Sequence, residues 1–498
     1  MKSKKLAVLL FILVLAIGLL PISTFAVQRT VAADSTASVT INNALENDEL
    51  SAYKVVDITY NAATNTLTHA WNSDFADYFA GTTTFNATAY TVEEFGELTS
   101  DSDVLKDLLA QLPNYIVARG IAAVDTQTVA DDGTATFADL AMGEYFIRPT
   151  SSTSVYQLML QKIEPTVADG TYVIDDVTFT AKNEEVNVAK TADKTSVTKG
   201  EKVNYTVTVD IPTYSANSTD KSFYISDLLP DGLTIDTATI KVQINGADVD
   251  TDAYTLDTTA TAEYTFKFSV DTDKYTASWA AEGGKQLTIT YTATLNNDNT
   301  TAVNVKETNT VTFDYSFYPY ENDSHEQKTD TFDVTTFAIK VDKFVSGNEA
   351  SKLAGAKFDL YRTATQAEID AGTAIDIPHT TVKGIKLEGG LTTDNSGAAT
   401  FAKYEANGTG YDYYLVETVA PSGYNLLDSA VKVNFTDADV AATAGIYTVQ
   451  VPNSSGIQLP ITGGTGTVIF TVIGIALMVG AVVLLVVSRR KSKADDNK

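Results

Sequence analysis

Three polar residues that could react with one another occupy strand positions where apolar side chains are expected. Lys190, Asp227 and Asn309 each fall in the core-facing row of an alternating segment, next to valine, isoleucine or phenylalanine. Side chains two residues apart lie on the same face of a strand, so the pattern predicts that all three are buried. Because buried ionisable groups are costly unless they are paired, we expect the lysine and the aspartate to meet.

A second set of the same kinds of residue follows in the same chain order. Lys343 continues a row of apolar residues, and Glu417 and Asn453 share their faces with aromatic and aliphatic neighbours. The neighbours are Phe337, Ile339 and Val341 for the lysine, Tyr413, Leu415 and Val419 for the glutamate, and Tyr447, Val449 and Val451 for the asparagine. Taken singly, each such residue is more simply explained as lying at a strand end that turns to solvent, with the lysine stem along the surface. The recurrence of the set favours a chemical role.

The chemistry that these residue types support is an intramolecular isopeptide bond between lysine and asparagine. Burial disfavours the ammonium, so the amine can be neutral and nucleophilic, and it keeps the acid protonated. The acid then polarises the asparagine carboxamide, the amine attacks the carboxamide carbon, and ammonia leaves. The predicted bonds join Lys190 to Asn309, promoted by Asp227, and Lys343 to Asn453, promoted by Glu417.

The elements that must position these residues are mostly strands. Segments that alternate threonine with valine, tyrosine or phenylalanine are punctuated by asparagine, aspartate and glycine, as in 205–209, 264–270, 287–293 and 311–315. This pattern predicts antiparallel strands with one buried face and an all-β fold of tandem Ig-like β-sandwich domains. One helix is predicted over 103–111, capped near Ser102 and stopped before Pro113, and a short one over 366–371.

Breaks in the strand pattern divide the exported chain into the domains 34–183, 184–333 and 334–458. Residues 1–33 are predicted to be an N-terminal signal peptide, because lysines precede an apolar run and small residues follow it. Cleavage is compatible with either Ala26 or Ala33 as the last residue removed.

The C-terminal segment, 459–498, contains a short motif, an apolar run and a basic tail, in that order. The uncharged run over 467–487 corresponds to a helix of about 31 Å, enough for a transmembrane helix in the precursor. The motif resembles the LPxTG sorting signal of Gram-positive surface proteins, in which a sortase cuts between Thr and Gly and transfers the Thr carboxyl to an amine. Its residues are Leu459, Pro460, Ile461, Thr462 and Gly463. The alternative is an ordinary single-pass anchor.

The composition excludes several functions. In 498 residues, 35 Lys and Arg stand against 63 Asp and Glu, and a net charge of −28 disfavours nucleic-acid binding. The absence of cysteine excludes disulfides, thiolate zinc sites and cysteine nucleophiles. No metal or other cofactor is predicted: the acidic run from Asp248 to Asp252 is similar to the start of a calcium loop, but Ala253 replaces the glycine such loops need.

Two further motifs carry a family resemblance. The segment 413–424, YYLVETVAPSGY, is similar to the E-box of Gram-positive pilins, and 353–358, LAGAKF, is similar to a segment of collagen-adhesin B-type domains. The whole layout resembles a major, or backbone, pilin of sortase-assembled pili. The resemblance implies isopeptide bonds between the first and last strands of a domain, with Asp227 and Glu417 as the promoting acids.

The same resemblance implies a lysine that links subunits. Pilins of this kind carry it in a WxxxVxVYPK motif, and the best match here is 177–183, VTFTAKN. Val177 and Lys182 fit, whereas Val173 stands at the tryptophan position and Thr-Ala replaces Tyr-Pro. Lys182 is therefore predicted to accept the Thr462 carboxyl of another subunit; the alternative is a solvated lysine at a domain boundary.

Together, these features predict a non-enzymatic shaft subunit of a secreted, cell-wall-anchored pilus on a Gram-positive surface. The implied partners are a pilin-polymerising sortase, identical subunits, minor pilins and peptidoglycan, and the sequence does not identify a host ligand. One alternative is a monomeric wall-anchored adhesin with B-type stalk domains, in which Lys182 is inert. A wall-anchored hydrolase would need a pair of carboxylates in the first domain. That domain contains Lys54 but no comparable lysine, acid and asparagine set.

Overall fold

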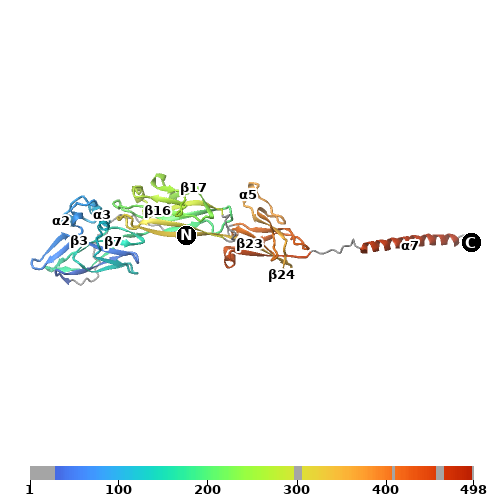
Figure 1. Ribbon diagram of the computed structural model, residues 1–498, viewed down its shortest axis with the longest axis horizontal. Coiled ribbons are helices and arrows are strands. Elements are labelled where there is room, and N and C mark those ends of the chain that lie inside the picture. The colour runs from blue at the N-terminus through green and yellow to red at the C-terminus, as the bar shows by residue number, and fades with distance from the viewer. Residues whose placement is uncertain (1–28, 297–304, 407–409, 456–464, 496–498) are drawn as a thin grey trace, which may run out of the picture. The chain divides into compact units, whose positions relative to one another are not determined.

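The computed structural model describes residues 29–296, 305–406, 410–455 and 465–495. It divides into two compact units, Met1–Thr336 and Phe337–Lys498. Strands dominate the described part of each unit, apart from the C-terminal helix (Figure 1). The predicted all-β class is confirmed, whereas the division into the domains 34–183, 184–333 and 334–458 stays a prediction.

The strands of the first unit up to residue 185 form several small sheets. One sheet contains β1 (Arg29–Thr30), β11 (Thr171–Ile174) and β10 (Thr166–Ala168), and a second contains β12 (Val177–Thr180), β2 (Thr36–Asn42) and β6 (Ala135–Ala141). A third pairs β13 (Asn183–Glu185) with β8 (Ser154–Tyr156). The fourth contains β4 (Thr66–Trp71), β3 (Glu49–Asn61), β7 (Gly143–Ser151) and β9 (Met159–Ile163), and β5 (Asp125–Thr128) also pairs with β3. Three helices accompany them: α1 (Ala76–Phe79), α2 (Val92–Gly96) and α3 (Asp103–Arg119).

Helix α3 begins where the sequence predicts but runs past the predicted stop. The Ser102 side chain accepts a hydrogen bond from the backbone of Leu105, and Gly120 ends the helix in the left-handed conformation. Pro113 lies inside the helix, so the expectation that it ends the helix is wrong. Proline removes one backbone hydrogen bond, but the turn that follows buries Tyr115 and Ile116, and this burial favours continuation.

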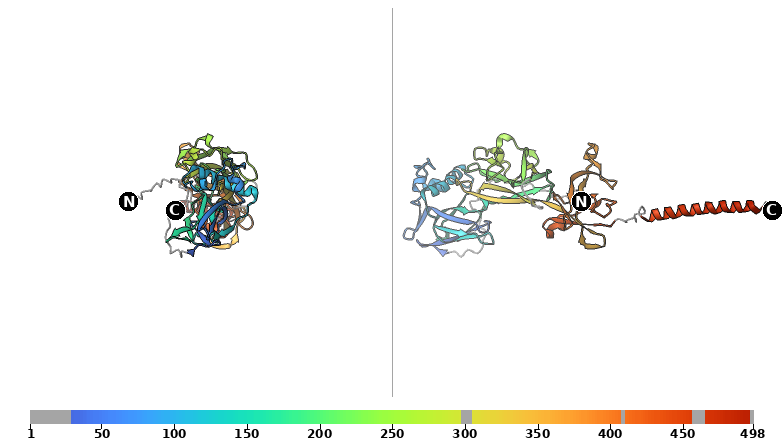
Figure 2. Two further views of the ribbon diagram at one scale, coloured as in Figure 1. Left: turned by 90° about the vertical axis from the view of Figure 1, so that its left-hand side faces the viewer. Right: turned by 45° about the vertical axis from the view of Figure 1, so that its right-hand side comes forward.

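The remaining strands of the first unit form two sheets that face each other across an apolar core. One contains β14 (Val188–Ala192), β15 (Lys202–Asp210), β21 (Gln286–Leu295), β17 (Leu233–Ile244) and β18 (Ala247–Asp248). The other contains β19 (Thr255–Asp257), β20 (Phe266–Val270), β16 (Phe223–Leu228), β22 (Val305–Ser316) and the start of β23 (His325–Val345). The short helix α4 (Ala277–Ala280) follows β20 and precedes β21 in the chain. Strands β22 and β23 form a long antiparallel pair (Figure 2). Buried residues alternate with less buried ones along β15 and β21, as period two requires.

The second unit has its own core between two sheets. The end of β23 pairs with β24 (Asn348–Lys352), β28 (Ala398–Tyr404) and, in parallel, β31 (Ile446–Asn453). The other sheet contains β26 (Ile375–Asp376), β27 (Lys383–Thr392), β25 (Lys357–Thr363), β29 (Tyr413–Val419) and β30 (Val431–Val433). Helices α5 (Gln366–Asp370), as predicted, and α6 (Asp437–Val440) lie between strands.

Several predictions concern the ends of the chain. Residues 1–28 and the motif Leu459–Gly463, with Thr462, lie outside the described residues. The apolar run 467–487 lies in helix α7 (Thr465–Asp495). Within the described parts of the chain, no helix is both long enough and apolar enough to cross a membrane.

Candidate functional site

The first predicted set comes together between the two sheets formed by strands β14 to β23. Lys190 lies on β14 in one sheet, and Asp227 on β16 and Asn309 on β22 lie in the other. The side chains of Lys190 and Asp227 are fully buried, and Asn309 is 0% exposed. A bond between the lysine and the asparagine would therefore join the two sheets directly.

A tyrosine that the sequence reasoning missed lies at the centre of this set. The hydroxyl of Tyr291, on β21, accepts a hydrogen bond from Nζ of Lys190 at 2.9 Å and from Nδ2 of Asn309 at 2.7 Å, and donates to Oδ1 of Asp227 at 3.0 Å. Nζ of Lys190 is also in hydrogen-bond contact with Oδ2 of Asp227. One phenol oxygen thus contacts the nucleophile, the acid and the amide.

The position of Tyr291 in its strand could have identified it from the sequence as a buried polar residue. It follows Leu287 and Ile289 on the core-facing side of an alternating segment, and a buried tyrosine hydroxyl needs a polar partner. Aromatic rings surround the site: Tyr205 stacks on Tyr291 with 5.4 Å between ring centroids, and Nζ of Lys190 lies 5.3 Å from the centroid of each ring.

Burial changes the protonation of this set. Desolvation lowers the pKa of Lys190 even though Asp227 opposes the change, and desolvation raises the pKa of Asp227 against the opposing effect of the lysine. Both shifts favour the neutral forms, an amine and a carboxylic acid. This is the pair of states that a nucleophilic lysine next to a proton donor requires.

The second set is built differently, from neighbouring strands of one sheet. Strands β23 and β31 are parallel, with Lys343 opposite Val451 and Asn453 opposite Val345. Glu417 reaches toward them from β29 in the other sheet. All three members of the set are buried, with exposures of 0% for Lys343, 2% for Glu417 and 1% for Asn453.

In the second set the acid contacts the amide directly. Nδ2 of Asn453 donates to both carboxyl oxygens of Glu417, at 3.0 and 3.2 Å, and Nζ of Lys343 lies 3.8 Å from the same carboxyl. Nζ of Lys343 also donates to the carbonyl of Val451 at 2.9 Å. Burial lowers the pKa of Lys343 to about 8, against the attraction of Glu417, so a sizeable neutral fraction exists near neutral pH.

One expected neighbour of Glu417 is not in its row. Val419 is 45% exposed, because the pairing of β25 with β29 shifts register between Lys357 and Phe358, which are opposite Val419 and Glu417 respectively. The extra residue in β29 turns Val419 away from the face that carries Glu417. The expectation that Val419 shares this face is therefore wrong.

Both asparagines keep one side-chain atom without a partner. Oδ1 of Asn309 and Oδ1 of Asn453 are buried and accept no hydrogen bond from the described residues. A buried amide oxygen normally has a donor, so both atoms are exceptions to the usual pairing. The same defect occurs in both sets.

Lys182 lies between β12 and β13 and is held there by its backbone. Its carbonyl accepts a hydrogen bond from the backbone of Gln157 at 3.0 Å, and Ala181 donates to the carbonyl of Asn42 at 2.8 Å. Partial burial lowers the pKa of Lys182. Within the described residues its ammonium has no carboxylate at ion-pair distance. It is a half-buried lysine on a firmly attached segment.

A cluster around His325 contains the residue types of a hydrolase triad, but its histidine is not in the neutral form that such a triad requires. Nδ1 of His325 lies 2.5 Å from Asp314, and Nε2 lies 3.0 Å from Asp220 and 3.2 Å from the hydroxyl of Ser222. Burial alone would lower the pKa of His325, but the two aspartates raise it to about 9. The Ser222 hydroxyl donates to Asp220. An imidazolium at neutral pH cannot act as the base for Ser222.

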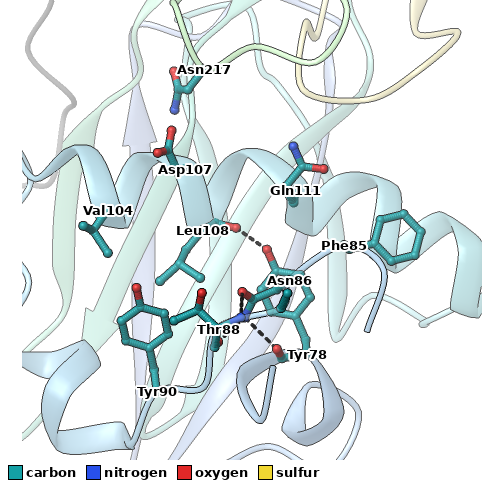
Figure 3. A pocket seen from close by; sticks show the side chains of 11 residues that line it. Tyr78, Phe85, Asn86, Thr88, Tyr90, Val104, Asp107, Leu108, Gln111 and Asn217 are labelled. Carbon is teal, nitrogen blue, oxygen red and sulfur yellow. Dashed lines mark hydrogen bonds between the residues drawn. The ribbon is translucent and has the colours of Figure 1, made fainter. Parts of the chain in front are cut away.

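A pocket of about 360 Å³ lies beside α3 in the first unit (Figure 3). Its polar lining largely stabilises its own wall, because Asn86 donates to the carbonyls of Tyr78 and Thr88, and the Tyr78 hydroxyl donates to the carbonyl of Leu108. In the described part of the chain, no group of three or more histidine and acidic side chains is arranged to hold a metal ion, at Asp248–Asp252 or elsewhere.

Known domain families match several stretches of the chain. Residues 338–448 match the prealbumin-like fold domain SpaA, residues 451–494 match the LPXTG cell wall anchor motif, and residues 178–317 match the C2 terminal domain of cell surface antigen I/II. The chain is thus an anchored Gram-positive surface protein built from β-sandwich domains.

Its relatives include fimbrial proteins. The chain is 28% identical to fimbrial subunit type 2 of Actinomyces naeslundii over 423 residues, 77% of this chain and 76% of that protein. It is 29% identical to fimbrial subunit type 1 of Actinomyces viscosus over 161 residues, 29% of this chain and 30% of that one. The T6 backbone pilin of Streptococcus pyogenes has a similar fold, with a TM-score of 0.57 at 19% identity, covering 82% of this chain and 81% of that structure. The resemblance to Gram-positive backbone pilins is confirmed.

Proposed function

We propose that the chain is a structural shaft subunit of a covalent surface pilus. The observation that carries the proposal is the second set: Lys343 and Asn453 lie on neighbouring strands, with the Glu417 carboxyl in contact with the amide nitrogen. Such a set serves to make one bond in its own chain, so the protein is not an enzyme. The cell-wall anchor match and the fimbrial relatives support the same conclusion.

The internal bond forms without a cofactor. Nζ of Lys343 attacks Cγ of Asn453, a C–N bond forms, and the bond from Cγ to Nδ2 breaks. Glu417 accepts the proton that the attacking amine loses and gives it to Nδ2, which leaves as ammonia. Lys190, Asn309 and Asp227 make the corresponding bond between the sheets of the first unit.

Polymerisation uses two other residues. A sortase cuts after Thr462 and holds its carboxyl as an acyl-enzyme, and Lys182 of an identical subunit accepts it. The pKa of Lys182, lowered by partial burial, supports this role because it increases the neutral amine fraction. Minor pilins and peptidoglycan are the further partners of such a fibre.

The polymer is tested by immunoblotting wall extracts boiled in detergent. We expect a ladder of high-mass species, and Lys182→Ala abolishes it because no amine remains to resolve the acyl-enzyme. Lys199→Ala is the matched control, since Lys199 is an exposed lysine of the same unit, and it leaves the ladder intact. A single band from the unmutated chain would support the monomeric adhesin instead.

The internal bonds are tested by the intact mass of the purified chain. We expect a mass lower than that of the sequence by two molecules of ammonia. Glu417→Ala restores one of them, because the proton has no carrier at the second set. Asp359→Ala is the control: this acid is also buried on a strand of the second unit, but it pairs with Lys386. A Glu417→Ala chain that still lacks two ammonia molecules would refute the assignment.

A further inference from the structure

The two sets differ in how the acid reaches the asparagine. Glu417 contacts Nδ2 of Asn453 directly. Aspartate is one methylene shorter, and in the described residues Asp227 makes no direct hydrogen bond to Asn309. The hydroxyl of Tyr291 fills the gap, at 2.7 Å from Nδ2 of Asn309 and 3.0 Å from Oδ1 of Asp227.

We propose that Tyr291 is a catalytic residue for the bond between Lys190 and Asn309, with its phenol relaying the proton from the attacking nitrogen to the leaving nitrogen. The inference rests on the proposed function and adds a component that the second set does not need. Tyr291 qualifies because its oxygen contacts both reacting nitrogens, Nζ of Lys190 at 2.9 Å and Nδ2 of Asn309 at 2.7 Å.

The relay balances without any other reactant. Nζ attacks Cγ of Asn309, and the bond from Cγ to Nδ2 breaks. The phenol gives its proton to Nδ2 and takes one from the attacking nitrogen, directly or through Asp227, so the tyrosine ends as it began. One amide and one ammonia are the products.

The surroundings of Tyr291 suit a proton relay in which the phenol returns to its neutral form. The residue is 2% exposed, and desolvation raises its pKa well above the usual value, so the resting state is the neutral phenol. Tyr205 stacks on one face, and Phe266 packs edge-on with 5.2 Å between centroids. The ring is held by packing, and the hydroxyl stays aligned with three partners.

The test follows bond formation during refolding. Full-length chain recovered unreacted from inclusion bodies is refolded, and the mass of the peptide pair containing Lys190 and Asn309 is measured over time. Tyr291→Phe slows this bond by about 100-fold or more, the usual range for a lost general acid–base group. The bond between Lys343 and Asn453 in the same molecules forms at the unmutated rate.

The control is Tyr315→Phe, which removes a buried tyrosine hydroxyl that donates to the carbonyl of Thr153 outside the site. In this variant the bond between Lys190 and Asn309 forms at the unmutated rate. A second measurement places 3-fluorotyrosine at position 291, which keeps the hydrogen bonds but makes the phenol more acidic; a relay changes the rate and its pH profile, whereas a packing role leaves both unchanged.

The outcomes separate the two claims. If the unmutated chain forms neither bond, the proposed function fails. If it forms both and Tyr291→Phe forms them equally fast, only the role of Tyr291 is overturned. If Tyr291→Phe and Tyr315→Phe are slowed alike, the effect is loss of folding and the relay is also overturned.

Discussion

At the scale of single residues, the chemistry depends on amines kept away from water. Lys343 is buried beside Glu417, yet desolvation outweighs that attraction and lowers its pKa to about 8. An ordinary lysine would be almost entirely charged at neutral pH. The proposed bond would convert the Lys343 amine into an uncharged amide, and so would end the cost of burying an ammonium.

This pKa predicts how the second bond depends on pH. Only the neutral amine attacks, so the rate rises as the pH increases from 6 through the Lys343 pKa of about 8, where half of the amine is neutral, and levels off at higher pH. The measurement is the loss of ammonia during refolding of unreacted chain at a series of pH values. A rate independent of pH over this range would contradict an attacking amine in equilibrium with its ammonium.

The sequence identified the members of both sets because core-facing rows are a local property. Lys190, Asp227 and Asn309 could each be assigned from neighbours two residues away. Tyr291 could be assigned in this way only as a buried residue, because its role arises when β21 lies opposite β16 and β22 and its hydroxyl meets three partners. Period two predicted its burial, not its contacts.

At the scale of elements, β1 favours the earlier of the two predicted signal cleavage sites. Arg29 and Thr30 pair with Ile174 and Val173 of β11, and the backbone of Val31 donates to Tyr172 at 3.1 Å. Val31 is 7% exposed. Cleavage after Ala33 would remove this strand and uncover the edge of β11.

We therefore predict that signal peptidase cleaves after Ala26, so that the mature chain begins at Val27. N-terminal sequencing of protein released from the wall measures this directly. Ala33→Lys is a suitable control, since it blocks a site that requires a small residue and leaves the N-terminus unchanged. An N-terminus at Asp34 would contradict the prediction.

Helix α3 shows where local sequence rules were not sufficient. Ser102 predicted the start, and Pro113 gave the wrong stop. A proline penalty is local, whereas the burial of Tyr115 and Ile116 depends on the packing of distant segments. The type of the element was predictable because it depends on local sequence. Its C-terminal boundary was not, because it depends on packing against distant segments.

At the scale of the whole molecule, the proposed bond between Lys343 and Asn453 would determine which part of the chain bears tension. By analogy with disulfides, closing a loop of this size contributes about 5 kcal/mol to stability. More directly, the proposed covalent link between the parallel strands β23 and β31 would carry force past the residues between them.

Pulling single molecules tests this. Asn453→Ala exposes the roughly 110 residues between the bonded positions to load, and they should add about 370 Å of extension when the unit unfolds. The unmutated chain shows no such step. Asn348→Ala, at an exposed asparagine of the same unit, is the control and also shows no step. Equal extension in all three chains would mean that the link does not bear load.

One consequence concerns variation between strains. Helix α5 and strand β26 lie in the stretch enclosed by the bond, and Ile369 and Ile375 there are 39% and 49% exposed. If the proposed bond between Lys343 and Asn453 forms, tension bypasses this stretch, and we expect substitutions or insertions in it to leave the strength of the fibre unchanged. An immune response directed at this surface could therefore select new variants indefinitely without weakening the attachment of the cell.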